Sequence, residues 1–318
     1  MTGGSFDFLV IIATYRRPEF LGEAIASALS QSGATKTIIV VDDCPDGSAR
    51  KTIEAIGDPA ILYLQNPRPS SGGPSRVRNF GFAEAGRRGI AARFVHFLDD
   101  DDVVPEGHYA AVKAAFDANP DAGVVFGNLA AFARLSDDPT RRAHQEDHVR
   151  GFQVILDATA NRARAYRDLG AWLGSRAIVR ELLRHHALFG PPMFYCGCCI
   201  IRHEVVSALG GFAEDVRLTE DLRYFGYAVY RYGAVYLDRI ACRYRTSDTS
   251  LTRSMIISPE QAAADGREMQ DVQRQWQRDL QRDLGPARYY GIKVLYKLVT
   301  RPLMDRVQGP MAARRGKV

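Results

Sequence analysis

The chain has 318 residues and a net charge of +5, and its 46% hydrophobic and 25% charged residues are ordinary for a globular protein with a full core in one large or two modest domains. No window reaches the roughly 18 uncharged apolar residues that a membrane-spanning helix needs. Residues 1–7 also lack a basic region followed by an apolar stretch of signal-peptide length. The sequence therefore argues against a secreted or membrane-spanning protein, and we expect a cytoplasmic one.

The five cysteines are an odd number without a paired framework, which argues against a disulfide-stapled fold. We expect them to be reduced and interpret Cys196-Gly197-Cys198-Cys199 as small buried residues, because no second Cys/His pair lies at zinc-site spacing. Basic residues are mostly arginine, so single arginines carry little weight as evidence for anion binding, and we expect no nucleic-acid partner. Residues 285–318 hold eight basic residues and one acid, Asp305, a net charge of +7 that leaves −2 for the rest of the chain.

Short β-branched apolar runs alternate with helical patterns in the first 130 residues. The runs predict strands at 8–12, 37–41, 61–64, 93–98 and 123–126. Between them, Pro18, Ser48 and either Pro74 or Ser75 begin predicted helices. This alternation predicts a doubly wound α/β unit with a parallel or mostly parallel sheet and right-handed crossovers.

Beyond residue 130 the pattern changes. Residues 135–190 are polar, arginine-rich and predicted to be helical, and specificity could reside there. Next come a predicted strand at 199–202, a helix after Thr219, and strand-like runs at 234–237 and 240–244. We therefore divide the chain into residues 1–130, 131–255 and a helical, basic C-terminal extension at 256–318.

Two helices are predicted in this extension, at 259–283 and 287–304. One face of the second helix is apolar and the opposite face is basic; the residues are Tyr289, Ile292, Leu295, Tyr296, Val299 and Leu303 against Lys293, Lys297 and Arg301. This pattern is typical of a helix that lies on a membrane surface, where anionic lipid attracts basic residues. A helix that packs its apolar stripe on its own domain has the same pattern, so both interpretations stay open.

Four consecutive aspartates, Asp99 to Asp102, directly follow the predicted strand at 93–98. Ligands of open α/β sheets bind beyond the carboxyl ends of strands, and Mg²⁺ or Mn²⁺ prefers oxygen ligands, usually one or two carboxylates together with substrate phosphates. The run therefore predicts a divalent-cation site. The alternative is a solvated acidic turn that caps a helix beginning at Pro105-Glu106.

Several short motifs, the Asp run among them, occur along the chain in a definite order. They are 13–18 (ATYRRP), 40–48 (VVDDCPDGS), Asn66, 72–74 (GGP), 76–79 (RVRN), 97–102 (FLDDDD), 210–212 (GGF) and 219–222 (TEDL). In this order and spacing, over more than 200 residues, the chain resembles glycosyltransferase family 2. The resemblance implies the GT-A fold, an α/β architecture with a doubly wound, mostly parallel but mixed sheet flanked by helices.

The resemblance also implies a nucleotide-sugar site. A carboxylate at a strand end can accept the N3 proton of uracil and an aromatic ring can stack on the base, roles that the family positions assign to Asp43 and Tyr15. Turn and helix-cap chemistry is the alternative for Asp42-Asp43. Arg78 falls in the family's Ala-Arg-Asn motif, where its guanidinium could bind base or phosphate oxygens. The remaining residues implied to bind the nucleotide sugar are Thr14, Arg17, Asp99 and Asp100.

The same resemblance makes Asp101 the ligand of a Mn²⁺ or Mg²⁺ cofactor that neutralises charge on the departing diphosphate. The histidine that often completes the family's metal site is replaced by Ser247, and Asp248 is the candidate to supply an oxygen ligand instead, unless diphosphate and water complete the shell. Asp102 could orient the donor or the metal, or cap the following helix.

Glu220-Asp221 resembles the family's catalytic pair, in which the aspartate is the general base. Such a base deprotonates the acceptor hydroxyl as it attacks the anomeric carbon from the face opposite the diphosphate, which inverts the configuration. The alternative is that two acids near a helix N-terminus act as caps.

The expected function is therefore transfer of a sugar from a nucleotide diphosphate donor to a hydroxyl of a glycan or lipid-linked acceptor in surface polysaccharide assembly. The expected donor is a UDP-sugar. The protein would act in the cytoplasm, at the inner face of the cell membrane if the helix at 287–304 contacts lipid. Two alternatives remain. A sugar nucleotidyltransferase is disfavoured because residues 13–17 contain no glycine, and a catalytically degenerate binding scaffold is disfavoured by the intact Asp101, Glu220 and Asp221.

Overall fold

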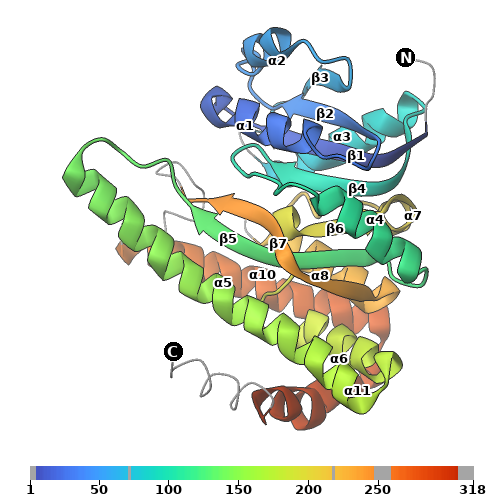
Figure 1. The fold of residues 1–318 in the computed structure, drawn as a ribbon. Coiled ribbons are helices and arrows are strands. Elements are labelled where there is room, and N and C mark those ends of the chain that lie inside the picture. The colour runs from blue at the N-terminus through green and yellow to red at the C-terminus, as the bar shows by residue number, and fades with distance from the viewer. Residues whose placement is uncertain (1–4, 71–72, 217–218, 247–258, 307–318) are drawn as a thin grey trace.

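The computed structural model describes residues 5–70, 73–216, 219–246 and 259–306, and its centre is one seven-stranded sheet (Figure 1). The strands, in the order β3-β2-β1-β4-β6-β5-β7, are β1 Ser5–Thr14, β2 Lys36–Asp42, β3 Ile61–Gln65, β4 Ala91–Asp99, β5 Val124–Phe132, β6 Cys199–Arg202 and β7 Ala234–Arg245. β6 is antiparallel to both of its neighbours and the other pairs are parallel, so the predicted mixed, mostly parallel sheet is confirmed.

Helices cover both faces of the sheet. They are α1 Pro18–Leu29, α2 Arg50–Ile56, α3 Pro74–Arg87, α4 His108–Ala118, α5 Pro139–Leu173, α6 Arg176–Phe189, α7 His203–Leu209 and α8 Glu220–Tyr232. On β1, Phe8, Val10 and Ile12 pack with α1 and α4. Leu9 and Ile11 point into the other core, with α3, α5, α6 and α8. Because both faces of the strand are covered, β1 is an unbroken apolar run rather than an alternating one.

The predicted helix starts are partly confirmed. α1 and α3 begin at Pro18 and Pro74 as expected. α2 begins at Arg50, two residues after Ser48, because the Asp42 carboxylate accepts a hydrogen bond from the Ala49 amide at 2.8 Å and holds the intervening turn.

The start predicted for the next helix, at Pro105-Glu106, is wrong. α4 begins at His108, and Gly107 precedes it in a left-handed conformation with φ 68°. The Asp run therefore does not cap this helix, and the capping interpretation of Asp102 is also wrong.

β7 is one strand where the sequence suggested two runs. Its pairing with β5 shifts register between Phe126 and Asn128. Gly127 lies at this shift, and a Cβ atom there would come 2.8 Å from the Ala241 Cβ and 2.9 Å from the Arg239 carbonyl oxygen. A glycine is thus needed where the two strands approach most closely.

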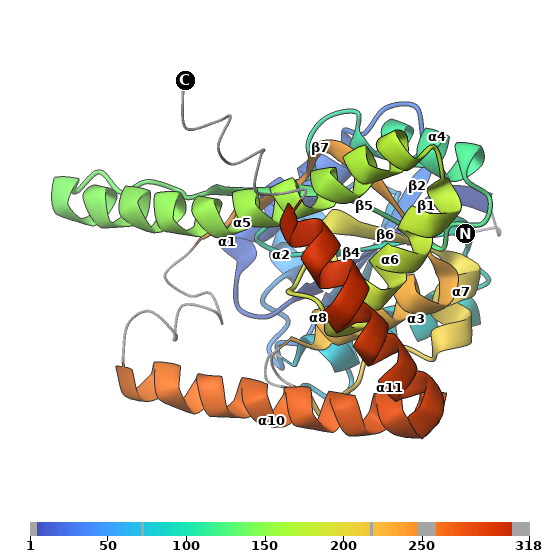
Figure 2. The ribbon, with the colours of Figure 1, turned by 90° about the horizontal axis from the view of Figure 1, so that it is seen from below.

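The C-terminal extension is helical, as predicted. It contains α10 Pro259–Leu284, α11 Pro286–Leu295 and a π-helical segment, η3 Tyr296–Thr300. The long helices α5 and α10 extend beyond the sheet in the same direction, and α11 crosses the lower face of the molecule (Figure 2). No helix within the described ranges has the length and apolarity needed to cross a bilayer.

The apolar face predicted for this region is only partly buried. Tyr289, Ile292 and Tyr296 are buried, and the first two share a cluster with side chains of α6, α8 and α10. Leu295 and Val299, predicted for the same face, are each 47% exposed. α11 contacts the rest of the protein along one side only. The π-helical turn of η3 is wider than an α-helical turn, so it changes the angular position of the residues that follow it.

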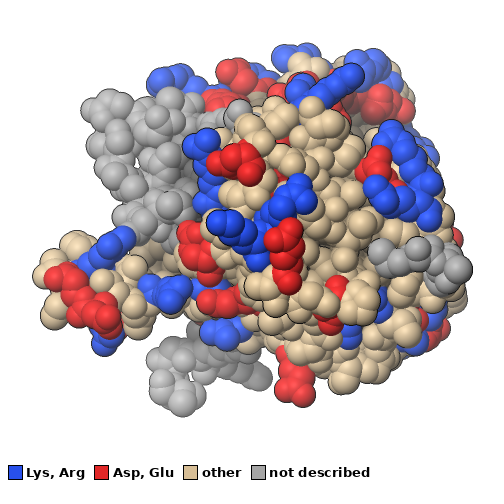
Figure 3. Space-filling view, turned by 90° about the horizontal axis from the view of Figure 1, so that it is seen from above, with Lys and Arg blue, Asp and Glu red and all other residues tan. Residues whose placement is uncertain are grey.

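The five cysteines are free and buried, in agreement with the sequence prediction. Basic and acidic side chains are intermixed on the face seen from above in Figure 3. This face therefore lacks the one-sided charge of residues 285–318.

Candidate active site

The carboxyl ends of three neighbouring parallel strands meet at one edge of the sheet. β1 lies between β2 and β4, and Ala13 is opposite Val41 on one side and Asp99 on the other. This register brings the segments after Thr14, Asp42 and Asp99 together. The motifs that are separate in the sequence therefore line one edge, which is where open α/β sheets bind ligands.

Arg17 contacts the middle of the Asp run. Its Nη1 donates to Asp101 Oδ2 at 2.9 Å and lies 3.4 Å from Asp100 Oδ1, and the two acid side chains are 10% and 6% exposed. Burial raises the pKa of both carboxyls above the usual range, neighbouring aspartates add to this, and Arg17 lowers both pKa values. The Thr14 hydroxyl also lowers the pKa of Asp100. The site thus concentrates negative charge next to one guanidinium.

The two aspartates after β2 have different partners. Asp42 bonds the amides of its own turn, which confirms the turn interpretation for this residue. Asp43 Oδ1 accepts from Asn66 Nδ2 at 2.7 Å and from the Ser70 amide at 2.9 Å, while its Oδ2 accepts from Ser70 Oγ at 2.8 Å. Asp43 therefore fixes the segment after β3. On the same edge, the half-buried Tyr15 ring lies 5.4 Å from the Arg16 guanidinium.

Arg78, on α3, joins the two acidic regions. Its Nη2 donates to Asp99 Oδ1 at 2.6 Å and its Nη1 donates to Glu220 Oε1 at 2.8 Å. The Arg78 and Glu220 side chains are 4% and 9% exposed, whereas Asp99 is 35% exposed. Sequence reasoning expected Arg78 to meet the nucleotide; in the structure its guanidinium is directed at these two carboxylates.

Asp221 is held by backbone groups. Its Oδ2 accepts from the Cys196 amide at 3.0 Å and its Oδ1 from the Leu222 amide at 2.8 Å. Burial and then the neighbouring Glu220 raise the pKa of Asp221 to about 7, while Arg78 and the Cys196 amide oppose the shift. A carboxyl with a pKa near neutrality is suited to general-base chemistry. Thr219, directly before the pair, has a φ of 64°, a left-handed conformation rare for a non-glycine residue and concentrated at functional sites.

Asp102 and Arg245 connect the Asp run to β7. Asp102 Oδ1 accepts from the Arg245 amide at 2.9 Å, and Arg245 Nε donates to the Asp101 carbonyl oxygen at 2.7 Å. The Arg245 side chain is 2% exposed and also pairs with Glu23 of α1. Arg245 was not singled out from the sequence, although it lies only two residues before Ser247.

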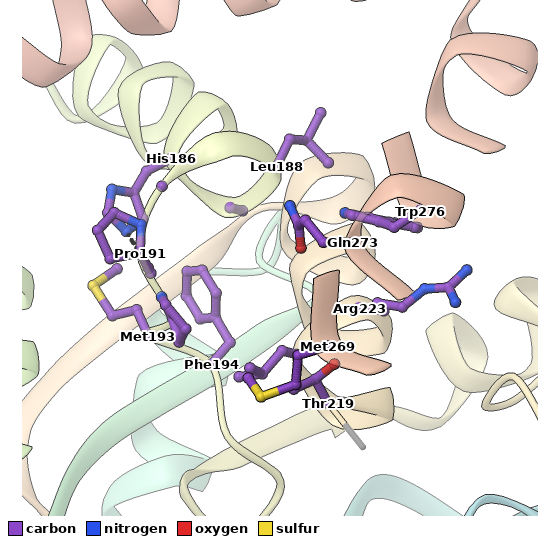
Figure 4. A pocket seen from close by; sticks show the side chains of 14 residues that line it. His186, Leu188, Pro191, Met193, Phe194, Thr219, Arg223, Met269, Gln273 and Trp276 are labelled. Atoms are coloured by element: carbon purple, nitrogen blue, oxygen red, sulfur yellow. Dashed lines mark hydrogen bonds between the residues drawn. The ribbon is translucent and has the colours of Figure 1, made fainter. Parts of the chain in front are cut away.

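A pocket of about 140 Å³ lies between the segment before β6, α8 and α10 (Figure 4). Thr219 and Leu222, which flank Glu220-Asp221, are part of its wall. Most of the other side chains that line the pocket are apolar or aromatic, and they include Leu188, Met193, Phe194, Met269 and Trp276. The α10 residues were missed from the sequence, because nothing in a polar helical stretch indicates which side chains face α8.

Of the two expected metal ligands, Asp101 and Asp248, only Asp101 belongs to the described residues. Asp248 and Ser247 lie outside the described residues, and within those residues no three His, Cys, Asp or Glu side chains come together as a metal site. The donors at the end of β4 are carboxylate oxygens, as hard cations prefer. Mg²⁺-type ions are commonly bound by one or two carboxylates plus substrate phosphates and water, so Asp101 fits a cation that binds together with a diphosphate.

The glycosyl transferase family 2 model matches residues 9–210. Since this is more than half of the chain, the protein belongs to glycosyltransferase family 2, and the resemblance noted from the motifs is confirmed. The family match ends before Glu220 and therefore leaves the pair at the start of α8 untested.

Two curated relatives act in glycan assembly. The succinoglycan biosynthesis protein ExoO of Rhizobium meliloti (strain 1021) is 36% identical over 98 residues, which cover 31% of this chain and 26% of the relative. The GalNAc(5)-diNAcBac-PP-undecaprenol beta-1,3-glucosyltransferase of Campylobacter jejuni is 31% identical over 121 residues, 37% of each protein. Less than two thirds of either relative is therefore matched.

Solved structures share the fold over nearly the whole chain. S. aureus TarS 1–349 in complex with UDP-GlcNAc has a TM-score of 0.58 at 17% sequence identity, covering 91% of this chain and 71% of TarS. The mannosyltransferase PcManGT of Pyrobaculum calidifontis in complex with GDP-Man and Mn²⁺ has a TM-score of 0.51 at 15% identity, covering 99% and 76%. At these identities the likeness establishes the GT-A fold.

Proposed function

We propose that this protein is a metal-dependent, inverting glycosyltransferase that moves a sugar from a nucleotide diphosphate donor to a hydroxyl of a glycan or lipid-linked acceptor during surface polysaccharide assembly. The observation that carries this proposal is the Arg78 bridge. Because one guanidinium binds both Asp99 and Glu220, acids from the end of β4 and the start of α8 face a common site. Residues 1–130 would bind the donor, 131–255 would supply the base and acceptor site, and 256–318 would form the extension.

The donor is proposed to be a UDP-sugar, bound at the edge formed by β1, β2 and β4. Asp43 and Tyr15 would hold the base, with Thr14, Asp99 and Asp100 near the sugar and diphosphate. Arg17 is suited to a diphosphate because a guanidinium binds phosphate oxygens through a fork of donors. When bound, Mn²⁺ or Mg²⁺, held by Asp101 and the proposed ligand Asp248, would stabilise charge on the leaving diphosphate.

Asp221 is the proposed general base. Its carboxylate would take the proton from the acceptor hydroxyl while the hydroxyl oxygen attacks the anomeric carbon and the nucleoside diphosphate leaves from the opposite face. The Cys196 and Leu222 amides fix the orientation of this carboxylate. Glu220, paired with Arg78, would position the base rather than take the proton itself.

The acceptor is proposed to enter through the pocket beside α8. Its wall includes Thr219 and Leu222, on either side of the pair that contains the base. The Trp276 ring and the neighbouring apolar side chains offer stacking and van der Waals contact for sugar rings. The relative from Campylobacter jejuni has a name that identifies a lipid-linked glycan as its substrate, which supports this acceptor class.

The test is substitution of Asp221 by Asn, which keeps the shape but removes the base. We expect kcat to fall by about 10²- to 10⁴-fold, with the UDP dissociation constant in the presence of Mn²⁺ unchanged. UDP release from UDP-sugars with lipid-linked and free glycan acceptors measures the rate, and D215N, at an exposed site nearby, is the matched control.

Wild-type turnover by D221N would remove the role assigned to Asp221. Formation of a UDP-sugar from UTP and a sugar phosphate would identify a nucleotidyltransferase instead. Mn²⁺-dependent UDP binding without turnover on any acceptor would favour the scaffold alternative.

A further inference from the structure

α11 and η3 present a second apolar surface that the proposed active site does not use. Their inner side is buried against the body, where the Tyr289 ring packs on Phe189 of α6 with ring centroids 5.5 Å apart. Five large apolar side chains on these same elements remain 47–73% exposed, and they are Tyr290, Val294, Leu295, Leu298 and Val299. A surface helix of a globular protein usually has one apolar stripe, facing the core. Here a second set of apolar residues faces outward.

Basic side chains accompany this outward surface. Arg288 and Lys297 are exposed and Arg301 is 68% exposed. The sequence from 285 to 318 carries a net charge of +7, with Asp305 as its one acid, while the rest of the chain sums to −2. Residues 307–318 lie outside the described ranges, so the basic residues that the structure places beside this surface are the three exposed ones above. The outward surface of α11 and η3 therefore combines exposed apolar side chains with basic ones.

We propose that this outward surface of α11 and η3 lies on an anionic lipid bilayer. The exposed apolar side chains would enter the boundary between headgroups and acyl chains, and the basic side chains would meet the anionic headgroups. A second copy of this chain fits less well, because it would bring two strongly positive segments together. The inference goes beyond the proposed function and does not depend on catalysis.

The way α11 is attached makes binding possible without unfolding. Its buried side chains share a cluster with Leu188 of α6, Tyr230 of α8 and Leu280 of α10, so the inner side stays packed while the outer side meets lipid. The segment directly after Phe189 lines the pocket whose wall includes Thr219 and Leu222. Lipid binding would thus place one wall of this pocket close to the bilayer.

The experiment is co-sedimentation of the full chain with vesicles of phosphatidylglycerol and phosphatidylcholine in equal parts, and with vesicles of phosphatidylcholine alone. We expect binding to the mixed vesicles that weakens with added salt. The double variant K297Q/R301Q should bind about 25-fold more weakly, since each basic residue near the surface contributes about fivefold. V294E/L298E should bind at least about tenfold more weakly, because it removes apolar contact and adds negative charge.

The control is V154E, which changes an apolar residue on α5 that is 69% exposed, between the 51% of Val294 and the 73% of Leu298, and should bind like the wild type. Circular dichroism verifies that each variant is folded, as expected for exposed positions. The proposal is overturned if the wild type does not bind the mixed vesicles at low salt, or if V294E/L298E binds as well as V154E. It is also overturned if the wild type forms a dimer that V294E/L298E dissolves, which would identify a protein interface.

Discussion

Each of the two acidic clusters of the site contains buried carboxylates and pairs with an arginine, yet their members are held in different ways. In the run at the end of β4, the four aspartates have different partners. Asp99 bonds to Arg78, Asp100 and Asp101 bond to Arg17, and Asp102 bonds to the backbone of β7. In the pair at the start of α8, Glu220 takes the ion pair with Arg78, and Asp221 bonds to backbone amides.

This difference indicates how carboxylates of one type acquire separate roles. The β4 cluster keeps its acids next to a cation, Arg17, which suits a place where diphosphate and metal charges meet. Asp221 is fixed by neutral amides, which suits proton transfer. Burial raises the pKa of Asp100 and of Asp221 alike, to about 7, so the bonding partners and not the pKa values distinguish the two clusters. Variants of the two clusters should therefore differ in the property that they lose.

The largest effect is expected from breaking the link between the clusters. Replacing Arg78 by Met would leave Glu220 buried without its ion-pair partner, and loss of one member of a buried pair costs about 3–5 kcal/mol. Urea denaturation monitored by circular dichroism measures the free energy of unfolding. R76M is the control, because Arg76 is 58% exposed and its loss should cost about 0.5 kcal/mol or less. Equal stability of the two variants would contradict the role of the bridge.

The next largest effect should distinguish a variant of the proposed metal ligand from a variant of the proposed general base. D101N should abolish the Mn²⁺-dependent stabilisation by UDP, which is about 2.7 kcal/mol at a hundredfold excess over the dissociation constant. D221N should retain it. Thermal unfolding with UDP, with and without Mn²⁺, measures both. If D101N responds like the wild type, Asp101 is not the metal ligand.

A smaller effect is expected from pH. Only the ionised form of Asp221 accepts a proton, so with its pKa raised to about 7, kcat should fall about tenfold for each unit below pH 7 and level off above it. The measurement is kcat at saturating donor and acceptor from pH 5 to 9, with circular dichroism to exclude unfolding. A profile that stays flat down to pH 5 would argue that this carboxyl is not the base.

The smallest effect concerns the acceptor pocket. Trp276 packs edge-on against Tyr227, with ring centroids 5.9 Å apart. The Cζ atom of the Arg223 guanidinium lies over the Trp276 ring, 5.2 Å from its centroid. W276A should raise the acceptor KM about fivefold, equivalent to about 1 kcal/mol of lost aromatic contact, without changing the donor KM. W276F should restore most of the affinity, and a change in donor KM alone would move the acceptor site elsewhere.

The sheet was predictable from the sequence because its strands are buried on both faces, and such strands stand out as apolar runs. The sequence predicts Asp43 and Asp101 just after strands and Asp221 at the start of a helix, and the structure places them there, while their proposed roles stay predictions. The sequence could not reveal that Arg78 turns to the acids or that Asp102 bonds to β7, because these contacts depend on how distant segments pack. It also could not separate the two apolar sides of α11, since the division depends on where α6 lies and on the π turn.

The Arg78–Glu220 contact spans 142 positions along the chain. Contacts between such distant segments form only after a long loop has closed, and proteins rich in them fold slowly. During synthesis at the ribosome, β1, β2 and β4 emerge well before Glu220 does. Assembly of the proposed catalytic centre must therefore wait until α8 has been made and Glu220 has reached Arg78.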